Sequence, residues 1–258
     1  MIAASATLKA GIEFAAERFR KSKHTLVLTG AGFSTPSGIP DFRTEGSGLW
    51  SRFEPLETAS LETFRTKPEK FYAWLRPLAL QIFDAQPNPA HLALVRIEKA
   101  GKIGRVVTQN IDMLHQRAGS MNVIELHGTL STLTCTQCFQ KVGAEPYIQP
   151  FIEKGEIPRC PNCNGVLKPD VILFGEQMPQ SAWHQAQRES RRCDVMVVAG
   201  SSLEVLPVAG LPLEAVDRGA HLIIINRSPT YLDGRADAVL EGEVEDIFPA
   251  IAEQVLNG

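Results

Sequence analysis

Apolar residues along the chain fall into blocks whose spacing predicts one helix and then a series of buried strands. The first helix is predicted from apolar positions spaced four, three and four residues apart, which are Leu8, Ile12, Ala15 and Phe19. It ends near residues 21–23, and an apolar run at residues 25–28 then predicts a buried strand. Similar runs, typical of strands covered on both faces, recur at residues 104–108, 123–126, 194–199 and 221–225.

Helical segments alternate with these strands, which predicts an α/β protein built on a Rossmann-like parallel sheet. Helices are expected from Pro68 onward, over residues 90–99 and over about residues 203–218. The intervening segments predict a smaller inserted domain. We expect a discontinuous sheet domain of residues 1–43, 84–130 and 168–258, and a small domain formed by a helical insert, residues 44–83, and a cysteine-bearing module, residues 131–167.

Composition places the chain among ordinary globular proteins. It has 258 residues, of which 44% are hydrophobic and 21% charged, and a net charge of −3. This charge argues against a strongly electrostatic nucleic-acid binder. The sequence lacks an apolar run of the roughly 20 residues that a membrane helix needs, and charges such as Glu13 and Glu17 interrupt any signal-peptide core. We therefore expect a soluble, cytoplasmic protein that needs no membrane.

A glycine-rich loop, residues 29–43, follows the first predicted strand. Gly30 and Gly32 let bare backbone N–H groups approach an anion, as in the pyrophosphate sites of α/β proteins. Ala31 and Thr35 belong to the same loop. A short glycine motif alone is weak evidence, but this one continues for about a dozen residues that a plain phosphate loop does not need.

The end of this loop suggests a site where a bound cofactor reacts. Asp41, Phe42 and Arg43 place an acid, an aromatic ring and a guanidinium just beyond the glycines. Arg43 can hold a phosphate through two hydrogen bonds, although it could instead pair with Asp41. Phe33 within the loop could serve only for packing.

Four of the five cysteines predict a metal site. Two Cys-x-x-Cys pairs offer four thiolates in the spacing of a zinc ribbon, at Cys135, Cys138, Cys160 and Cys163. Such a site is closed, so the zinc is structural and residues 131–167 form a zinc-ribbon module. Two redox pairs would instead require a thioredoxin-like setting, which the sequence does not show. Cys193 beside a strand is expected to be a packing residue.

Polar residues follow two predicted strands, where the sites of α/β proteins assemble. Asn110 and Asp112 flank Ile111 just beyond one strand, and His127 follows the next. Imidazole can act as a general base near neutral pH, whereas in isolation His127 would be a polar cap on a strand end. Asp112 could support developing positive charge, or be an acid at the start of a helix.

Two later strand ends suit the adenosine half of a dinucleotide, because they carry small hydroxyl residues and an amide. These residues are Gly200, Ser201, Ser202 and Asn226. A dehydrogenase fingerprint places an acid at the end of the second strand, about 20 residues after the glycines. The spacing here does not fit that pattern, which argues against hydride transfer.

With these motifs in this order, the chain resembles a sirtuin, an NAD-dependent protein deacylase. The resemblance covers about residues 20–250 and is supported by further segments at residues 168–176, 200–203 and 225–226. It implies that NAD is a consumed co-substrate and that zinc is structural. It also implies catalytic roles for His127, as the base that deprotonates the ribose, and for Asn110.

The resemblance assigns further residues to binding roles. It places Asn110, Ile111, Asp112 and Phe42 at nicotinamide, Gln109 at ribose, and the backbone of Glu243 and Val244 at adenine. The remaining NAD contacts implied are Gly30, Ala31, Gly32, Thr35, Asp41, Arg43, His127, Gly200, Ser201, Ser202 and Asn226. The acyl-lysine peptide is expected to add as a strand between Phe174, Gly175 and Glu176 on one side and Glu204 and Val205 on the other. Glu204 stands where the family more often has an apolar residue.

Acyl preference and two other functions stay open. Family members that remove acidic acyl groups carry Tyr-x-x-Arg near Tyr72, but here Arg76 comes one position late, about 100° around a helix. We therefore expect acetyl or longer apolar acyl groups. Protein mono-ADP-ribosylation would use the same motifs. A non-catalytic zinc-ribbon module that senses NAD or binds nucleic acid is disfavoured by the acidic charge and by His127. Oligomeric state and protein substrates are not indicated.

Overall fold

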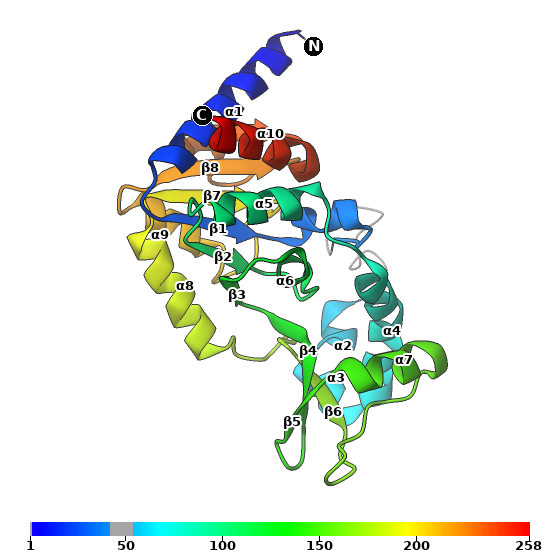
Figure 1. Ribbon diagram of the computed structural model, residues 1–258. Coiled ribbons are helices and arrows are strands. Elements are labelled where there is room, and N and C mark those ends of the chain that lie inside the picture. The colour runs from blue at the N-terminus through cyan, green and yellow to red at the C-terminus, as the bar shows by residue number, and fades with distance from the viewer. Residues whose placement is uncertain (1, 42–53) are drawn as a thin grey trace.

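The computed structural model describes residues 2–41 and 54–258, and its core is a six-stranded, all-parallel sheet (Figure 1). This confirms the predicted α/β class, and the apolar runs lie in the strands as expected. The strands stand in the order β3-β2-β1-β7-β8-β9. Their bounds are β1 Thr25–Thr29, β2 Arg105–Thr108, β3 Val123–Glu125, β7 Val195–Ala199, β8 His221–Asn226 and β9 Ala238–Glu241.

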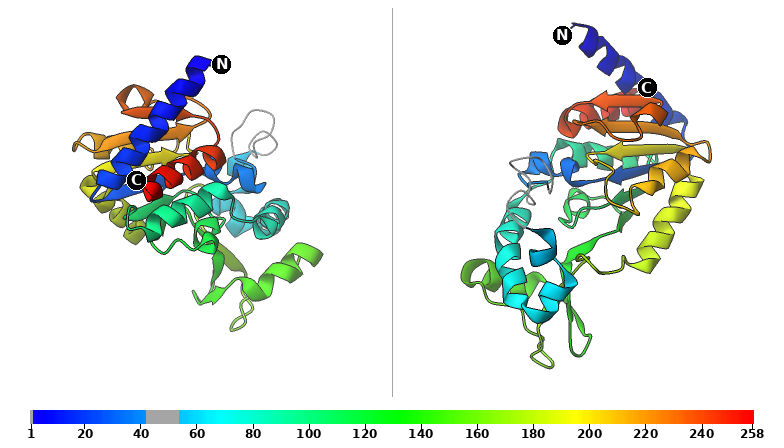
Figure 2. Two further views of the ribbon diagram at one scale, coloured as in Figure 1. Left: turned by 45° about the horizontal axis from the view of Figure 1, so that its top comes forward. Right: turned by 180° about the vertical axis from the view of Figure 1, so that it is seen from behind.

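Helices cover both faces of this sheet, because alternate strand residues supply an apolar surface to each side. Val27 and Ile223 face one layer, whereas Leu26 and Ile224 face the other. Figure 2 shows the two helical layers on opposite sides of the strands. The first layer consists of α1 Ile2–Lys21, α5 Pro89–Lys99 and α10 Val244–Asn257, and the second of α8 Gln180–Arg192 and α9 Gly210–Val216.

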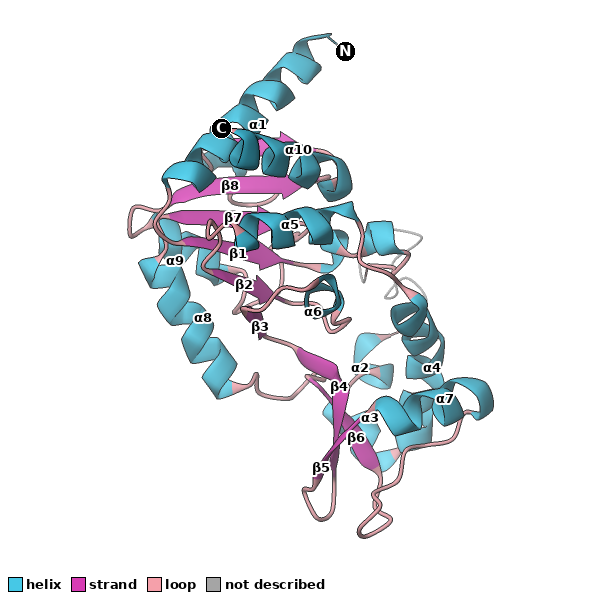
Figure 3. Cartoon of the chain, viewed as in Figure 1, coloured by secondary structure: helices cyan, strands magenta, loops and turns pink. Residues whose placement is uncertain are grey.

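A second, smaller group of helices and strands lies below β3 in the view of Figure 3. Its antiparallel sheet has the order β5-β4-β6. Phe71, Leu75 and Phe151 form its apolar core with residues of the sheet. The elements are α2 Pro55–Thr58, α3 Leu61–Thr66, α4 Pro68–Asp84, β4 Gly128–Cys135, β5 Lys141–Gly143, α7 Glu145–Lys154 and β6 Leu167–Val171.

The helix predicted over residues 203–218 is wrong in its extent. Only α9, Gly210–Val216, is helical there, and residues 203–209 form turns. Leu203 has a φ of 56°, and Pro207 disfavours helical backbone at the residue before it. Among the helices of residues 2–41 and 54–258, none combines the length and apolar character that crossing a membrane requires.

Candidate functional site

Two loops meet at backbone distance above the carboxyl ends of the adjacent strands β1 and β7. Gly32 N donates to Gly200 O at 2.8 Å, and Gly30 N donates to Ala199 O at 3.2 Å. A Cβ at Gly30 would lie 2.8 Å from Gly200 O, and one at Gly200 would lie 2.2 Å from Phe33 N. Gly200 also has a φ of 60°, which favours glycine. Only glycine therefore allows this contact. It also commits the N–H groups of Gly30 and Gly32 to the chain, so the expectation that these two groups are bare for an anion is wrong.

The segment after β1 turns at once into two short 3-10 helices, Ala31–Phe33 and Thr35–Ser37, in place of a long α-helix. Thr35 Oγ1 donates to Gly32 O at 3.1 Å and holds this turn closed. Ala31 and Thr35 are half-buried, so both reach the surface of the loop. Phe33 is fully buried against Phe248 and two histidines, which confirms the packing interpretation.

Asn110 and Asp112 are joined to this loop through Ser34, a residue that the sequence did not single out. Asn110 Nδ2 donates to Gly30 O and to Ser34 Oγ, both at 3.0 Å, and Ser34 Oγ donates to Asp112 Oδ2 at 2.7 Å. All three side chains are buried. A hydroxyl just after the glycines was the only sequence signal for Ser34, and it does not reveal these partners.

The two carboxyl oxygens of Asp112 have different partners, so one residue is compatible with both of the roles considered for it. Oδ1 accepts from Leu114 N at 2.8 Å, at the start of α6 Leu114–Ala118, as a helix N-terminal acid does. Oδ2 accepts from Ser34 and faces the loop. Burial raises the pKa of the carboxyl, while the hydrogen bond from Ser34 lowers it. The acid is thus held in one orientation in a partly desolvated setting.

His127 lies two residues beyond β3 with its ring fixed in one tautomer. Nδ1 lies 3.0 Å from Gln109 O, and a carbonyl can only accept, so Nδ1 carries the proton and Nε2 is the basic nitrogen. Burial lowers the pKa of the imidazole, and the bond to Gln109 partly raises it. The next residue, Gly128, has a φ of 77° and passes so close to Asp170 O that a Cβ would lie 1.9 Å from it. The ring is therefore anchored on both sides.

The predicted adenosine-side residues are brought together by hydrogen bonds. Gln109 Nε2 donates to Ser201 Oγ at 2.9 Å, and Asn226 Nδ2 donates to Ser201 O at 3.3 Å and to Ser228 O at 2.8 Å. Ser201 is buried and Ser202 is exposed. The ends of β2, β7 and β8 thus form one polar rim beside the glycine loop.

The remaining predicted NAD-binding residues do not share one structural setting. Glu243 immediately precedes α10 and its side chain pairs with Arg227 at 3.3 Å, while the Val244 side chain is buried in the core. Asp41 is half-buried. Phe42 and Arg43 lie outside the described residues.

The two segments expected to bind the peptide are turns that hydrogen bonds within the chain hold in place. Phe174 N donates to Ala59 O, and Phe174 O accepts from Leu61 N, each at 3.0 Å, so both of its backbone groups are used within the chain. Glu176 Oε2 accepts from Lys168 Nζ at 3.0 Å and from Leu173 N at 2.8 Å. Gly175 is exposed between them.

The second of these segments continues the rim formed by Ser201 and Ser202. Glu204 is exposed and Val205 is half-buried. Val205 O accepts the backbone N–H of Ala209 at 2.9 Å, which closes the turn before α9.

The four predicted zinc ligands form one cluster. Cys135 Sγ lies 3.4 Å from Cys163 Sγ, Cys138 Sγ lies 3.6 Å from Cys160 Sγ, and all four sulfurs lie within 4.8 Å of one another. A tetrahedral zinc with bonds of about 2.3 Å separates its sulfurs by roughly 3.8 Å, so the donor set fits the ion. With all four positions filled by thiolates, zinc here would be structural.

Cys193 lies apart from this cluster and is buried in the second helical layer. Its Sγ donates to Ser190 O, and burial raises its pKa to about 12. It is a packing residue, as expected.

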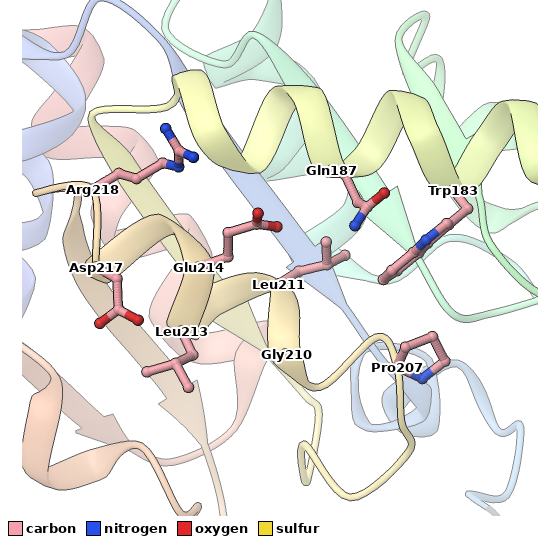
Figure 4. A pocket seen from close by; sticks show the side chains of 9 residues that line it. All are labelled: Trp183, Gln187, Pro207, Gly210, Leu211, Leu213, Glu214, Asp217 and Arg218. Carbon is pink, nitrogen blue, oxygen red and sulfur yellow. The ribbon is translucent and has the colours of Figure 1, made fainter.

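A groove of about 710 Å³ runs between α8 and α9 (Figure 4). Trp183 and Pro207 stand at one end, and Asp217 and Arg218 at the other. None of the predicted site residues lines it.

Comparison with known proteins gives consistent matches. A model described as the Sir2 family matches residues 30–207. The NAD-dependent protein deacylase 2 of Archaeoglobus fulgidus is 45% identical over 245 residues, which cover 95% of this chain and 96% of that protein. The NAD-dependent protein deacetylase of Saccharolobus solfataricus is 43% identical over 243 residues, which cover 94% and 96% respectively.

Solved structures match as closely. A Sir2 homologue in complex with NAD superposes with a TM-score of 0.87 at 40% identity, over 95% of this chain and 94% of that one. Sir2Tm bound to a propionylated peptide superposes with a TM-score of 0.84 at 37% identity, over 94% and 98%.

Proposed function

The chain belongs to the Sir2 family, and from this premise we propose how its site performs NAD-dependent protein-lysine deacylation. NAD supplies the ADP-ribosyl group that takes up the acyl group, with release of nicotinamide and of the free lysine. The proposal rests on one observation, which is that three features meet at one edge of the sheet. They are the glycine loop, the pair Asn110 and Asp112 linked by Ser34, and the base His127 in a fixed orientation.

His127 is assigned the proton transfer. Its Nε2 is the unprotonated nitrogen because Nδ1 donates to Gln109 O. A general base acts best when its pKa lies near the working pH, and burial keeps this ring neutral. His127 therefore accepts a proton from a ribose hydroxyl of the co-substrate.

Asn110 and Asp112 are assigned the nicotinamide side. An amide and a carboxylate held rigidly in a desolvated setting can bind a carboxamide and oppose positive charge without reorganising. Ile111, half-buried between them, offers an apolar contact for the ring. The roles predicted from the sequence for Phe42, as aromatic cover, and for Arg43, as phosphate ligand, stay part of this proposal.

The rest of the co-substrate is assigned to the polar rim. Gly30, Ala31, Gly32 and Thr35 would face the pyrophosphate, Gln109 the ribose, and Ser201, Ser202 and Asn226 the adenosine. The adenine contact proposed at Glu243 and Val244 would use backbone, because the Val244 side chain is buried.

The acylated substrate is a protein or peptide that adds as a strand between the turns at residues 174–176 and 204–205. On the first turn the backbone of Gly175 and the carbonyl of Glu176 are proposed for pairing, because both backbone groups of Phe174 and the N–H of Glu176 are already used within the chain. Glu204 and Val205 border the other side. Backbone pairing reads little sequence, so substrate tolerance would be broad. We propose a cytoplasmic location, where the cysteine thiols stay reduced.

Apolar acyl groups suit the small domain better than acidic ones. Arg76 is directed to the end of α7, where Nε donates to Ile152 O at 2.8 Å and Nη2 to Glu153 O at 2.7 Å. Leu75 occupies the preceding position and is buried, and the Tyr72 hydroxyl donates to Leu167 O. The Arg76 guanidinium is therefore committed to capping α7, and Lys70, the other cation near Tyr72 on α4, lies 3.4 Å from Glu57 Oε2.

We predict that acetyl- and butyryl-lysine peptides are deacylated at least about tenfold faster than the succinyl-lysine peptide of the same sequence. The measurement is kcat/KM with NAD for the three peptides, with products identified by mass spectrometry. A succinyl preference would overturn the acyl assignment. ADP-ribosylated protein in place of acyl-ADP-ribose would instead indicate ADP-ribosyl transfer.

A further inference from the structure

Two histidines that the mechanism does not use lie side by side beneath the glycine loop, with their ring planes tilted by 58°. His91 on α5 and His115 on α6 are 0% and 1% exposed, and their ring centroids lie 4.9 Å apart. Phe33 of the loop packs against both, at 4.8 Å and 5.1 Å. Each ring has one nitrogen bonded within the chain and one without a partner among the described residues.

The tautomer of His115 follows from its bonded nitrogen. Nε2 lies 2.9 Å from Thr29 Oγ1, and Thr29 donates its own hydroxyl proton to Thr108 Oγ1 at 2.9 Å. Thr29 can therefore only accept from the ring, so Nε2 carries the proton. Nδ1 is then a buried acceptor, and it is the nitrogen that lacks a partner in the described chain.

His91 presents the complementary case. Its Nδ1 accepts the backbone N–H of Asn88 at 3.4 Å as part of a capping box that begins α5. A neutral ring must then carry its proton on Nε2, which is the nitrogen without a partner in the described chain. A buried donor and a buried acceptor thus belong to two neighbouring rings, 4.9 Å apart, and a small ring rotation or one bridging water would join them.

This pair is connected to Asn110 by a short hydrogen-bonded path. Thr29 and Thr108 are register partners at the ends of β1 and β2. Thr108 Oγ1 accepts from Thr29 and also from Asn110 N, the latter at 3.1 Å. The proton on His115 Nε2 therefore fixes the direction of the Thr29 hydroxyl, and through it the oxygen that holds the Asn110 backbone.

We propose that His115 is a positioning residue for nicotinamide release, held in one neutral tautomer by His91 and acting on Asn110 through Thr29 and Thr108. The inference rests on the proposed function, because that function gives Asn110 its role. Burial lowers the pKa of both rings, that of His115 to about 3, which is consistent with a neutral pair at working pH.

The kinetic test compares two substitutions of the same ring. His115→Phe keeps the ring volume but removes the donor, whereas His115→Gln places an amide N–H near the position of Nε2. We expect His115→Phe to lower kcat for nicotinamide release about tenfold, with KM for the acyl peptide within about twofold, and His115→Gln to retain kcat within about threefold. The matched control is His184→Gln on the exposed face of α8, which should leave both constants unchanged.

A double substitution separates positioning from loss of packing. Thr29→Val interrupts the same path one step later, so Thr29→Val combined with His115→Phe should lower kcat no more than the larger single effect. Multiplying effects, or a full kcat in His115→Phe, would overturn the proposal. If His115→Phe does not fold, Thr29→Val compared with the wild type carries the kinetic test alone.

The tautomers are tested without turnover. In ¹⁵N NMR of the whole protein, both rings should be neutral with the proton on Nε2 between about pH 5.5 and 8, a range that spans the unperturbed histidine pKa of about 6.5. An Nδ1–H tautomer or a charged ring at either position would overturn the pairing. A wild type that releases no nicotinamide would instead refute the proposed function, and the NMR result would still decide the pair.

Discussion

At the scale of single residues, hydrogen bonds select the chemical form of the groups in the site. Gln109 O selects the tautomer of His127, Ser34 orients Asn110 and Asp112 together, and burial shifts the pKa of each ionisable member. The glycine loop and His127 could be predicted from the sequence, because a strand must end beside each. Ser34 could not, because its importance lies in two partners about 76 and 78 positions away.

The lowered pKa of His127 predicts that activity persists to a pH below the usual titration range of a histidine side chain. The base must be neutral, and burial disfavours the charged ring, so the base form survives to lower pH than in a free imidazole. We expect kcat/KM to fall on the acid side with a midpoint below about 6.5, the unperturbed value. The measurement is a pH–rate profile with acetyl peptide, and an acid midpoint above about 7 would contradict the assigned environment.

Buried neutral histidines also link stability to pH. The folded-state pKa of His115 is about 3, below the unfolded value of about 6.5, so the unfolded state binds the extra proton. The stabilising effect is complete above about pH 6.5 and declines as the pH falls toward 3, by at most about 1.4 kcal/mol per pH unit for one ring. We expect His115→Phe to flatten the pH dependence of the free energy of unfolding between about pH 6 and 4 relative to the wild type. Parallel curves in urea titrations would contradict a neutral buried ring.

At the scale of elements, strands with continuous apolar runs were predictable, whereas segments whose form depends on neighbours were not. α8 has few apolar residues and was not predicted, yet its Ala186 is buried against the sheet layer. Residues 203–209 carry helix-forming residues, but Leu203 and Pro207 turn the chain there. The cysteine spacing succeeded because it encodes a local geometry that needs no distant partner.

β4 connects the cysteine cluster to the proposed base, since it runs from Gly128, next to His127, to Cys135. We therefore predict that Cys138→Ser, or zinc removal by a chelator, releases the metal and abolishes amide protection in residues 128–171, with slower protection loss in β1 and β7. Metal analysis and hydrogen exchange measure this. Cys193→Ser is the control, because that thiol is buried outside the cluster. Equal metal loss in both variants would refute the assignment of ligands.

At the scale of the whole molecule, the parallel sheet brings the ends of β1, β2, β3, β7 and β8 to one edge, where residues from distant parts of the chain meet. This follows from strand order, which the sequence did not reveal. It explains how the motifs at residues 30, 110, 127, 201 and 226 come together at one edge of the sheet. The division into two domains at the boundaries given above stays a prediction.

The central claim is that His127 at this edge performs the proton transfer of NAD-dependent deacylation. Its most direct test is mass spectrometry of an acetyl-lysine peptide incubated with NAD and either wild type, His127→Ala or the control His184→Ala. We predict matched release of deacetylated peptide and acetyl-ADP-ribose by the wild type and the control, and a loss of at least about a hundredfold in His127→Ala. Undiminished deacetylation by folded His127→Ala would contradict it.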